Sequence, residues 1–384
     1  MAERNNNEVN ILSTLYVHPN LSRSDLSQRL ELNKASVSEY TNKLLDTGII
    51  RENGTGDSTN KGGRKPICLE INYRYGLCLG IDLAPDEISY ILCTLNLEVV
   101  SEGTIRTAVS SANVLEQLTV IIQKAVKMAA AYTGGLLGVT LAIHGIVDET
   151  DIRFTPNYDI YKCDLHAELG KLYPGLPVYF INESNASALC EAYAQRIKNL
   201  VAVNIGRGLG AGIVLKGRVL HGVNGYAGEI GHVVIIPDGK KCNCGNRGCF
   251  ERYCSDEALL EYYNSLAAKP ITTIKELAER KAKKQPEAIE AIRYNLKYMA
   301  LLMNHLMKTI APEIIVINSD LAYYINNYTQ TLQDMTSKTY KQNVLIRPSA
   351  FNHKSVMLGS VYLTIQEFIH AFAQFTQPAS TLPR

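Results

Sequence analysis

The first fifty residues place their apolar side chains at helical spacing. A break at residues 18–20 follows the first such run, and Ser22 with Asp25 three residues later predicts that a second helix begins with a capping box. Asn33 is suited to cap a third helix, which is expected to end at Gly48. The apolar positions of the first run, which recur with a period of three to four residues, are Val9, Ile11, Leu12, Leu15 and Tyr16.

The third predicted helix has one apolar and one polar face. Val37, Leu44 and Leu45 point inward. The outward face carries small polar and charged side chains, namely Lys34, Ser36, Ser38, Glu39 and Asn42. Two short helices joined by a tight turn, the second of which presents such groups near its N-terminus, have the form that enters a DNA major groove. Lys34, Ser36, Ser38 and Asn42 are therefore candidate DNA contacts.

Two short apolar runs then flank a glycine-rich loop. Ile49 with Ile50 predicts one strand, and alternating apolar residues at 67–71 predict the next. The loop between them carries three cations, Lys61, Arg64 and Lys65. A slim cationic strip of this kind fits a DNA minor groove, which makes the segment the wing of a winged helix-turn-helix. A solvated linker is the alternative, because residues 1–75 hold ten Lys and Arg against nine Asp and Glu.

The rest of the chain alternates strand and helix patterns twice. Apolar runs with turn residues from 75 to 103, a helical run at 114–131 and a buried strand with its following loop at 136–149 predict one α/β unit, and the pattern then begins again. Such duplication favours two similar lobes that face a cleft in which a ligand binds. We expect three domains: a winged helix-turn-helix at 1–72, a first lobe at 73–182 completed by a C-terminal helix at 353–384, and a second lobe at 183–352.

Composition and charge limit the partners and the cellular compartment that we expect for this chain. The chain has 384 residues, of which 46% are hydrophobic, and a net charge of +2, so its overall charge indicates neither a nucleic-acid nor a membrane partner. It has no apolar run of about 18 residues and no segment that resembles a signal peptide. We therefore expect a cytoplasmic protein that makes no contact with a membrane. In that compartment nine cysteines favour metal binding or chemistry over disulfides.

A cluster of cysteines stands between residues 242 and 254. Cys242, Cys244 and Cys249 have one and four residues between them, and the interleaved glycines allow the tight chain reversals that this spacing needs. Three thiolates supply three of the four tetrahedral ligands that Zn²⁺ prefers. The spacing leaves two candidates for the fourth ligand, His232 and Cys254. A histidine bound to zinc through one ring nitrogen would offer the other to the cleft, beside the carboxylates of Glu229 and Glu251.

Together these motifs resemble the ROK family of sugar-responsive repressors and sugar kinases. The motifs that carry the resemblance are the N-terminal winged helix, "GID", "PN", "NESNA", "GRGLGAG", "AGEIGH" and "CNCGNRGCFE". The resemblance implies an actin-like, ribonuclease-H-like two-lobe fold, a monosaccharide site in the cleft and a bound zinc ion with His232 as its fourth ligand. It also implies a set of sugar contacts, which are Asn157, Asn182, Glu183, Glu229, His232 and Glu251.

Several positions depart from the kinases of this family. Residues 82–86 lack the glycine pair that wraps phosphates, and Pro85 removes a backbone donor. Residues 318–319 replace the glycine pair on which adenine lies, and Glu183 stands where the kinases have a catalytic aspartate. Only the glycine-rich hairpin at 206–212 is retained. These departures favour a regulator that is not an enzyme and resemble the xylose-type repressors of the family.

Two further departures lie at or beside the expected sugar pocket. His144 precedes Gly145 where members usually have Pro-Gly, and Tyr161 stands where many have a tryptophan. These positions bear on which sugar is bound, and we expect both to line or adjoin the pocket.

The sequence therefore predicts a DNA-binding repressor of carbohydrate-utilisation genes, a homodimer or homotetramer, that a monosaccharide such as xylose releases from its operator. An ATP-dependent sugar kinase and a repressor controlled by a phosphotransferase protein are the alternatives. The apolar helix at 291–310 is expected to be either core or an oligomer interface.

Overall fold

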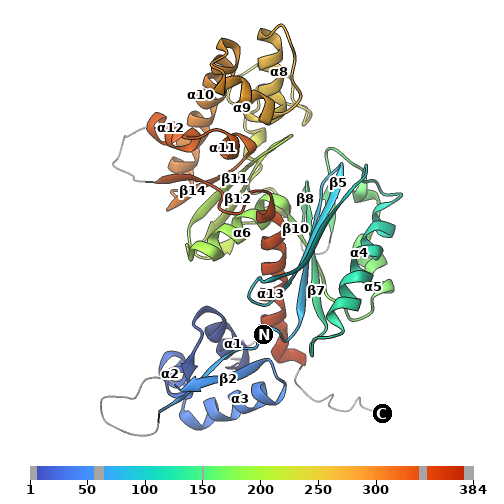
Figure 1. Cartoon of the computed structure of the whole chain (residues 1–384), viewed down its shortest axis with the longest axis vertical. Helices are drawn as coiled ribbons and strands as arrows, with labels where there is room; N and C mark the ends of the chain where they lie inside the picture. The colour runs from blue at the N-terminus through green and yellow to red at the C-terminus, as the bar shows by residue number, and fades with distance from the viewer. Residues whose placement is uncertain (1–6, 56–64, 149–150, 337–343, 376–384) are drawn as a thin grey trace.

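The computed structural model describes residues 7–55, 65–148, 151–336 and 344–375. It consists of a small N-terminal domain and two α/β lobes (Figure 1). The domain and the two lobes are each built on one main sheet. These three sheets fall within the segments 1–72, 73–182 and 183–352 respectively. The α/β fold with an N-terminal winged helix-turn-helix that the sequence predicts is confirmed.

Over residues 7–55 and 65–72, the N-terminal domain has three helices and a three-stranded sheet of order β1-β3-β2. Its elements are α1 (Asn7–Val17), β1 (Leu21–Ser22), α2 (Arg23–Leu30), α3 (Lys34–Asp46), β2 (Ile50–Thr55) and β3 (Ile67–Ile71). Ser22 and Asp25 form the predicted capping box of α2, and Asn33 caps α3. Gly48 follows the end of α3 with a φ of 77°, a conformation that glycine adopts without strain. The sequence did not indicate the two-residue strand β1.

The first lobe is a mixed sheet of order β10-β7-β4-β5-β6. Helices α4 and α5 pack on one face of the sheet, and the C-terminal helix α13 (Ser355–Phe375) packs on the other. The remaining elements are β4 (Leu77–Leu83), β5 (Glu87–Thr94), β6 (Val99–Arg106), α4 (Val114–Ala129), β7 (Leu136–Ile143), β8 (Ile146–Val147), β9 (Ile152–Phe154), α5 (Leu165–Leu172) and β10 (Val178–Asn182).

The second lobe repeats this plan with a sheet of order β13-β12-β11-β14-β15, covered on one face by α6. Helix α10 belongs to the core of this lobe, since its apolar residues such as Met299 and Met303 are buried in the same cluster as residues of β11, and the helix packs against α8. The lobe comprises α6 (Glu183–Gln195), β11 (Leu200–Ile205), β12 (Leu209–Leu215), β13 (Arg218–Val219), α7 (Glu251–Cys254), α8 (Asp256–Leu266), α9 (Ile274–Ala282), α10 (Pro286–Thr309), β14 (Ile314–Asn318), α11 (Asp320–Tyr324), α12 (Tyr328–Met335) and β15 (Leu345–Pro348).

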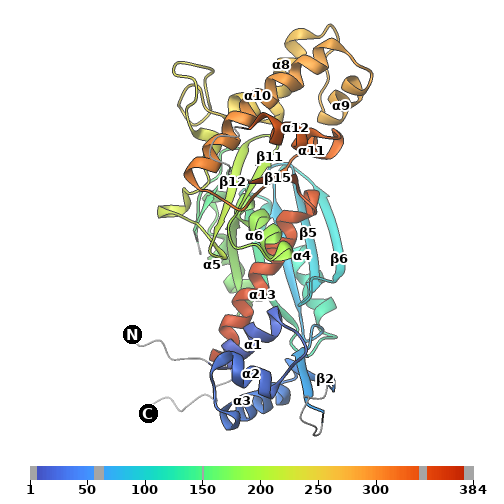
Figure 2. The ribbon, with the colours of Figure 1, turned by 90° about the vertical axis from the view of Figure 1, so that its left-hand side faces the viewer.

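Helices α6 and α13 cross where the two lobes meet (Figures 1 and 2). A side chain at Gly359 of α13 would collide with the backbone oxygen of Ala186 in α6, so the crossing needs a glycine. Beside it, Ser187 donates a hydrogen bond to Ser355, which also accepts one from Asn318. The buried carboxylate of Glu191 accepts a hydrogen bond from Ser349, in the segment between β15 and α13. A glycine and several buried side-chain hydrogen bonds therefore define the joint between the lobes.

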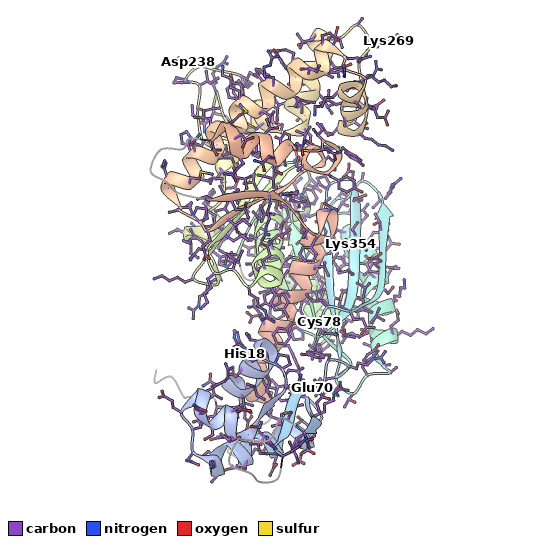
Figure 3. The ribbon with its side chains drawn as sticks, turned by 60° about the vertical axis from the view of Figure 1, so that its left-hand side comes forward. His18, Glu70, Cys78, Asp238, Lys269 and Lys354 are labelled. Carbon is purple, nitrogen blue, oxygen red and sulfur yellow. The ribbon has the colours of Figure 1, made fainter. Side chains whose placement is uncertain are left out.

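The N-terminal domain packs directly against the first lobe, since α1 contacts α13. Its core residues, among them Leu12 and Leu44, belong to the same buried cluster as Val361 of α13. Figure 3 labels Cys78, a first-lobe member of this cluster, between Glu70 of β3 and Lys354 just before α13. Domain and lobe therefore share one apolar core.

None of the described helices is long and apolar enough to cross a membrane. All nine cysteines are free. Six of them lie outside the cluster of Cys242, Cys244 and Cys249. Among these six, burial raises the thiol pKa most at Cys78, Cys93, Cys190 and Cys254. Buried neutral thiols of this kind act as packing residues.

Candidate functional site

A cleft of about 880 Å³ opens between the two lobes. Its floor includes the ends of three neighbouring strands of the first lobe: Asp82 lies near the end of β4, His144 follows β7, and Asn182 is the last residue of β10. Because β4 and β10 both run parallel to β7, these ends meet at one edge of the sheet. Ligands of open α/β sheets bind at such edges.

Asp82 and His144 form an ion pair on this floor. His144 Nε2 lies 2.8 Å from Asp82 Oδ1. Burial alone would lower the pKa of His144, but the Asp82 carboxylate outweighs it and raises the pKa to about 9, so the ring is cationic near neutral pH. The backbone N–H of His144 donates to the Tyr158 hydroxyl, which donates to the backbone oxygen of Leu83. The histidine that departs from the family pattern is thus fixed in the cleft.

Asn182 and Glu183 stand at the start of α6. The Asn182 side-chain oxygen accepts from the N–H groups of Ser184 and Asn185, and its amide nitrogen donates to Gly145 O and Glu183 Oε2. An amide has two donors and two acceptor sites, so this side chain is fully used within the protein. Asn182 thus orients Glu183, and both residues line the cleft. A direct sugar contact by Asn182 stays a prediction.

Three glutamates face the cleft from the second lobe and α6: Glu183, Glu229 and Glu251. Glu251, the first residue of α7, accepts from the backbone N–H of Leu209 at 3.3 Å. Burial raises the pKa of Glu229 to about 7, and the negative charges of Glu183 and Glu251 add to the effect. The carboxylates therefore lie close enough to act on one ligand.

Of the other predicted sugar contacts, Asn157 and His232 also line the cleft. The side chain of Asn157 is exposed there, directly after Pro156. Tyr161 does not line the cleft among the described residues: 42% of it is exposed, and its ring packs beside Phe154. Tyr161 therefore does not line the pocket, and the expectation that it adjoins the pocket stays a prediction.

The structure brings together one histidine and three cysteines near the cleft. The ligand atoms of His232, Cys242, Cys244 and Cys249 all lie within 4.8 Å of one another. His232 Nδ1 is 3.7 Å from Cys242 Sγ, and Cys244 Sγ is 3.7 Å from Cys249 Sγ. A tetrahedron with Zn–S bonds of about 2.3 Å has edges of roughly 3.8 Å, so this donor set fits zinc in chemistry and spacing.

The loop that carries the cysteines depends on glycine. Gly245 and Gly248 have φ angles of 95° and 83°, and a side chain at Gly248 would collide with the backbone oxygen of Ile236. Cys254, the alternative fourth ligand, is buried in α7 outside the cluster, where its backbone oxygen accepts from Asn295. Figure 3 labels Asp238, in the loop that leads from His232 to these cysteines. The geometry therefore favours His232 over Cys254.

His232 connects this cluster to the cleft. Its Nδ1 atom faces the sulfur atoms, and its Nε2 atom lies 3.9 Å from Glu229 Oε2. One ring can thus serve a metal on one side and a ligand of the cleft on the other.

The candidate DNA-binding surface lies on α3, at the far end of the molecule from the second lobe (Figure 1). Lys34 and Asn42 are exposed, and Ser36 and Ser38 are half-buried. Arg23 of α2, which the sequence analysis did not single out, donates to Asn42 Oδ1 and to Thr41. Of the wing cations, Lys65 is exposed, while Lys61 and Arg64 lie outside the described residues.

Comparisons with known proteins agree with this architecture. A model of the ROK family matches residues 78–367, and a model of winged helix-turn-helix DNA-binding domains matches residues 4–51. A putative xylose repressor from Caldicellulosiruptor sp. (strain Rt8B.4) is 30% identical over 386 residues, covering 94% of this chain and 96% of that protein. The xylose repressor of Bacillus subtilis (strain 168) is 28% identical over 375 residues, with the same shares covered.

A solved structure extends the match to three dimensions. The crystal structure of a ROK family transcriptional regulator, a homolog of the E. coli MLC protein, superposes with a TM-score of 0.81 at 27% sequence identity. It covers 97% of both chains, so the similarity includes the DNA-binding domain as well as both lobes.

Proposed function

The chain belongs to the ROK family, and on this premise we propose that it is a cytoplasmic transcriptional repressor of carbohydrate-utilisation genes. Its winged helix-turn-helix binds operator DNA, as a homodimer or homotetramer, until xylose or a related monosaccharide enters the cleft. One observation carries the proposal: the winged helix-turn-helix shares its apolar core with the first lobe, and this lobe lines a polar cleft large enough for a sugar. Relatives of nearly full length are named xylose repressors.

The cleft offers paired hydrogen-bonding groups that suit vicinal hydroxyls. We assign sugar contacts to Asn157, Glu183, Glu229, His232 and Glu251, with Asn182 acting through Glu183. Carboxylates accept two hydrogen bonds at close spacing, which neighbouring sugar hydroxyls donate. A neutral ligand with many hydroxyls therefore satisfies this set without a counter-ion.

The cluster near the cleft supports a structural zinc. His232, Cys242, Cys244 and Cys249 would hold it, and the ion would supply cohesion to a loop that has little core of its own. Through His232 it would also fix the ring nitrogen that faces Glu229. Zinc thus supports the sugar site through this histidine.

Three features argue against phosphoryl transfer. Pro85 has no N–H to offer a phosphate, and the carboxylate of Glu251 already accepts the Leu209 N–H in the one glycine-rich hairpin that the chain retains. Asn318, where the kinases have a glycine, donates its amide to Ser355. We therefore propose a sensor with no kinase activity.

A route from the cleft to the DNA-binding domain runs along α6. The helix begins at Glu183 in the cleft and ends near Tyr193, whose ring stacks on Tyr362 of α13 at 4.1 Å and on Tyr16 of α1 at 5.8 Å. A ligand can shift an equilibrium only by its difference in affinity for the two states. Closure of the lobes on a sugar would move α6, and this stack passes the movement to α1.

Replacing Tyr193 with alanine is expected to uncouple sugar from DNA. In the parent protein, we expect the sugar to weaken DNA binding by a factor of about 5 to 150, which is the usual range of allosteric coupling. In the variant, the same sugar should weaken DNA binding less than about twofold. Fluorescence anisotropy of labelled operator DNA measures this factor. Tyr262→Ala is the matched control, because Tyr262 stacks on Tyr294 at 4.0 Å within the second lobe. Full coupling in the Tyr193 variant would contradict this route.

One experiment tests the function as a whole. The protein should bind DNA from the promoter of its own gene region, and one member of a panel of pentoses, hexoses and amino sugars should release it, while Mg-ATP and the same sugar yield no ADP. Steady ADP formation would make the protein a kinase. Release by a cell extract but by no sugar would favour the protein-partner alternative.

A further inference from the structure

We propose that Arg23 of α2 orients the side-chain amide of Asn42 so that α3 reads an adenine in the major groove of the operator. The inference rests on the proposed function, because it needs α3 to bind DNA. It adds to that function a base preference at one position and a positioning residue that lies outside α3.

Arg23, the first residue of α2, joins this helix to α3 and to β2. Figures 1 and 2 show these three elements together at one end of the molecule. All three guanidinium nitrogens have partners: Nε donates to Thr41 Oγ1 at 3.1 Å, Nη2 donates to Asn42 Oδ1 at 3.1 Å, and Nη1 lies 3.7 Å from Glu52 Oε1. The side chain is only 28% exposed, so contacts within the domain hold it in place.

Thr41 holds the guanidinium at one point of α3. Its side chain is fully buried, and its hydroxyl donates to the backbone oxygens of Val37 and Ser38 while it accepts from Arg23. A buried hydroxyl with these partners cannot rotate without leaving a polar group unsatisfied. The guanidinium is therefore held beside the next residue of the helix, Asn42.

The held guanidinium decides which way the Asn42 amide faces. Asn42 is exposed, and a free amide on such a surface can turn by 180° and so exchange the places of its oxygen and nitrogen. A guanidinium has only donors, so it favours the orientation in which the amide oxygen faces it. The oxygen keeps a second lone pair for DNA, and within the described structure the amide nitrogen keeps both of its N–H donors.

An acceptor and a donor side by side match the major-groove edge of adenine. Adenine presents its N6 donor beside its N7 acceptor, and an Asn amide binds the two together, whereas guanine presents two acceptors. Opposite guanine, the Asn42 oxygen would face an acceptor, and the bond to Arg23 opposes turning that oxygen away. We therefore expect α3 to discriminate adenine from guanine at the base pair that Asn42 contacts.

Glu52 of β2 keeps Arg23 from serving as an ordinary phosphate contact. An unpaired arginine on this surface would bind a phosphate of any sequence and make binding more dependent on salt. Arg23 is instead paired with a carboxylate and donates two hydrogen bonds to α3. It therefore acts on DNA through the orientation of Asn42 and not through its own charge.

Selection from a randomised DNA library, carried out with the full chain, finds the base pair that Asn42 contacts. The parent should select a defined sequence, and Asn42→Ala should lose a preference for adenine at one position of each half-site and keep the rest. Selection of no sequence by the parent would overturn the proposed function, and the inference with it. An unchanged selected sequence in Asn42→Ala, or a lost preference for a base other than adenine, would overturn the inference alone.

Two replacements of Arg23 test its positioning role at that base pair. In the parent, fluorescence anisotropy should give a preference for adenine over guanine of about tenfold. The preference should fall below about threefold in Arg23→Met, which lacks donors, and in Arg23→Lys, which keeps the charge but lacks the fork that spans Thr41 and Asn42. Because this ratio compares two DNAs bound to the same protein, partial unfolding of a variant does not alter it. An unchanged preference in either variant would overturn the inference and leave the repressor function standing.

The salt dependence of binding separates orientation from phosphate contact. Loss of a phosphate contact lowers the slope of log affinity against log salt concentration by about one, and we expect Arg23→Met to change it by less than about half of this. Glu52→Gln is the matched control: it removes the ion pair but leaves both hydrogen bonds to α3, so the preference for adenine should stay within about twofold of the parent. A slope lowered by about one in Arg23→Met, with the preference for adenine intact, would make Arg23 a phosphate contact and refute its positioning role.

Discussion

Replacing Cys249 with serine is expected to strip the protein of zinc. The Cys249 sulfur is fully buried and lies 3.7 Å from Cys244 Sγ in the four-residue cluster. A serine hydroxyl does not ionise near neutral pH and is a poor zinc ligand, so only three of the four donors remain. After dialysis against a chelator, we expect metal analysis to find about one zinc per chain in the parent and almost none in the variant.

The loss of metal should also lower thermal stability and sugar affinity. A ligand held at a thousand times its dissociation constant stabilises the folded state by about 4 kcal/mol, so the unfolding midpoint should fall by roughly 5–10 °C. Sugar affinity should fall because the ring of His232 is no longer fixed beside Glu229. A zinc-free variant that binds sugar at full strength would contradict the proposed link between the two sites.

Cys254→Ala provides the control and decides between the two candidate ligands. Cys254 is buried against the core of the second lobe and lies outside the cluster. Its replacement removes a small apolar group, so we expect a modest loss of stability and an unchanged zinc content. Loss of zinc in this variant, together with its retention in His232→Ala, would make Cys254 the fourth ligand.

Local patterns were enough to predict much of the fold. The capping box at Ser22 and Asp25, the cap at Asn33 and the turn at Gly48 are all signals carried within a few residues, and each is confirmed. The cysteine cluster is equally local, because its spacing and glycines determine how the loop closes. Short-range signals of this kind are readable without knowledge of the tertiary structure.

Features that depend on contacts distant in sequence were not predictable in the same way. The Asp82–His144 pair joins residues 62 positions apart, and the Asp86–Arg207 pair joins residues 121 apart. Tyr16, Tyr193 and Tyr362 stack on one another and so join the helices α1, α6 and α13. The sequence of each helix alone is consistent with an isolated amphipathic helix and does not indicate this contact. The role of Asn182 likewise emerged only once its four hydrogen-bonding partners were in place.

Replacing Glu229 with glutamine is expected to produce a repressor that binds DNA and ignores its inducer. The substitution keeps the size of the side chain and removes the charge that Glu229 carries above its pKa of about 7. At pH 8 or above, a hydrogen bond from a sugar hydroxyl therefore loses its charge-assisted part. Such bonds contribute about 1.5–3 kcal/mol, against about 1 kcal/mol for neutral ones, so sugar affinity should fall by roughly 3- to 30-fold or more if two hydroxyls are bound. Titration calorimetry measures this directly.

DNA affinity should remain within about twofold of the parent, because Glu229 lies in the second lobe, outside the core that the DNA-binding domain shares with the first. Glu290→Gln is the control, since Glu290 pairs only with Arg293 of the same helix in the described structure. Weakened sugar binding with intact DNA binding separates Glu229 from a general effect on folding, which would lower both. Normal induction of the Glu229 variant would remove this carboxylate from the sugar site and leave Glu183 and Glu251 as the only acidic groups of the cleft assigned to bind the sugar.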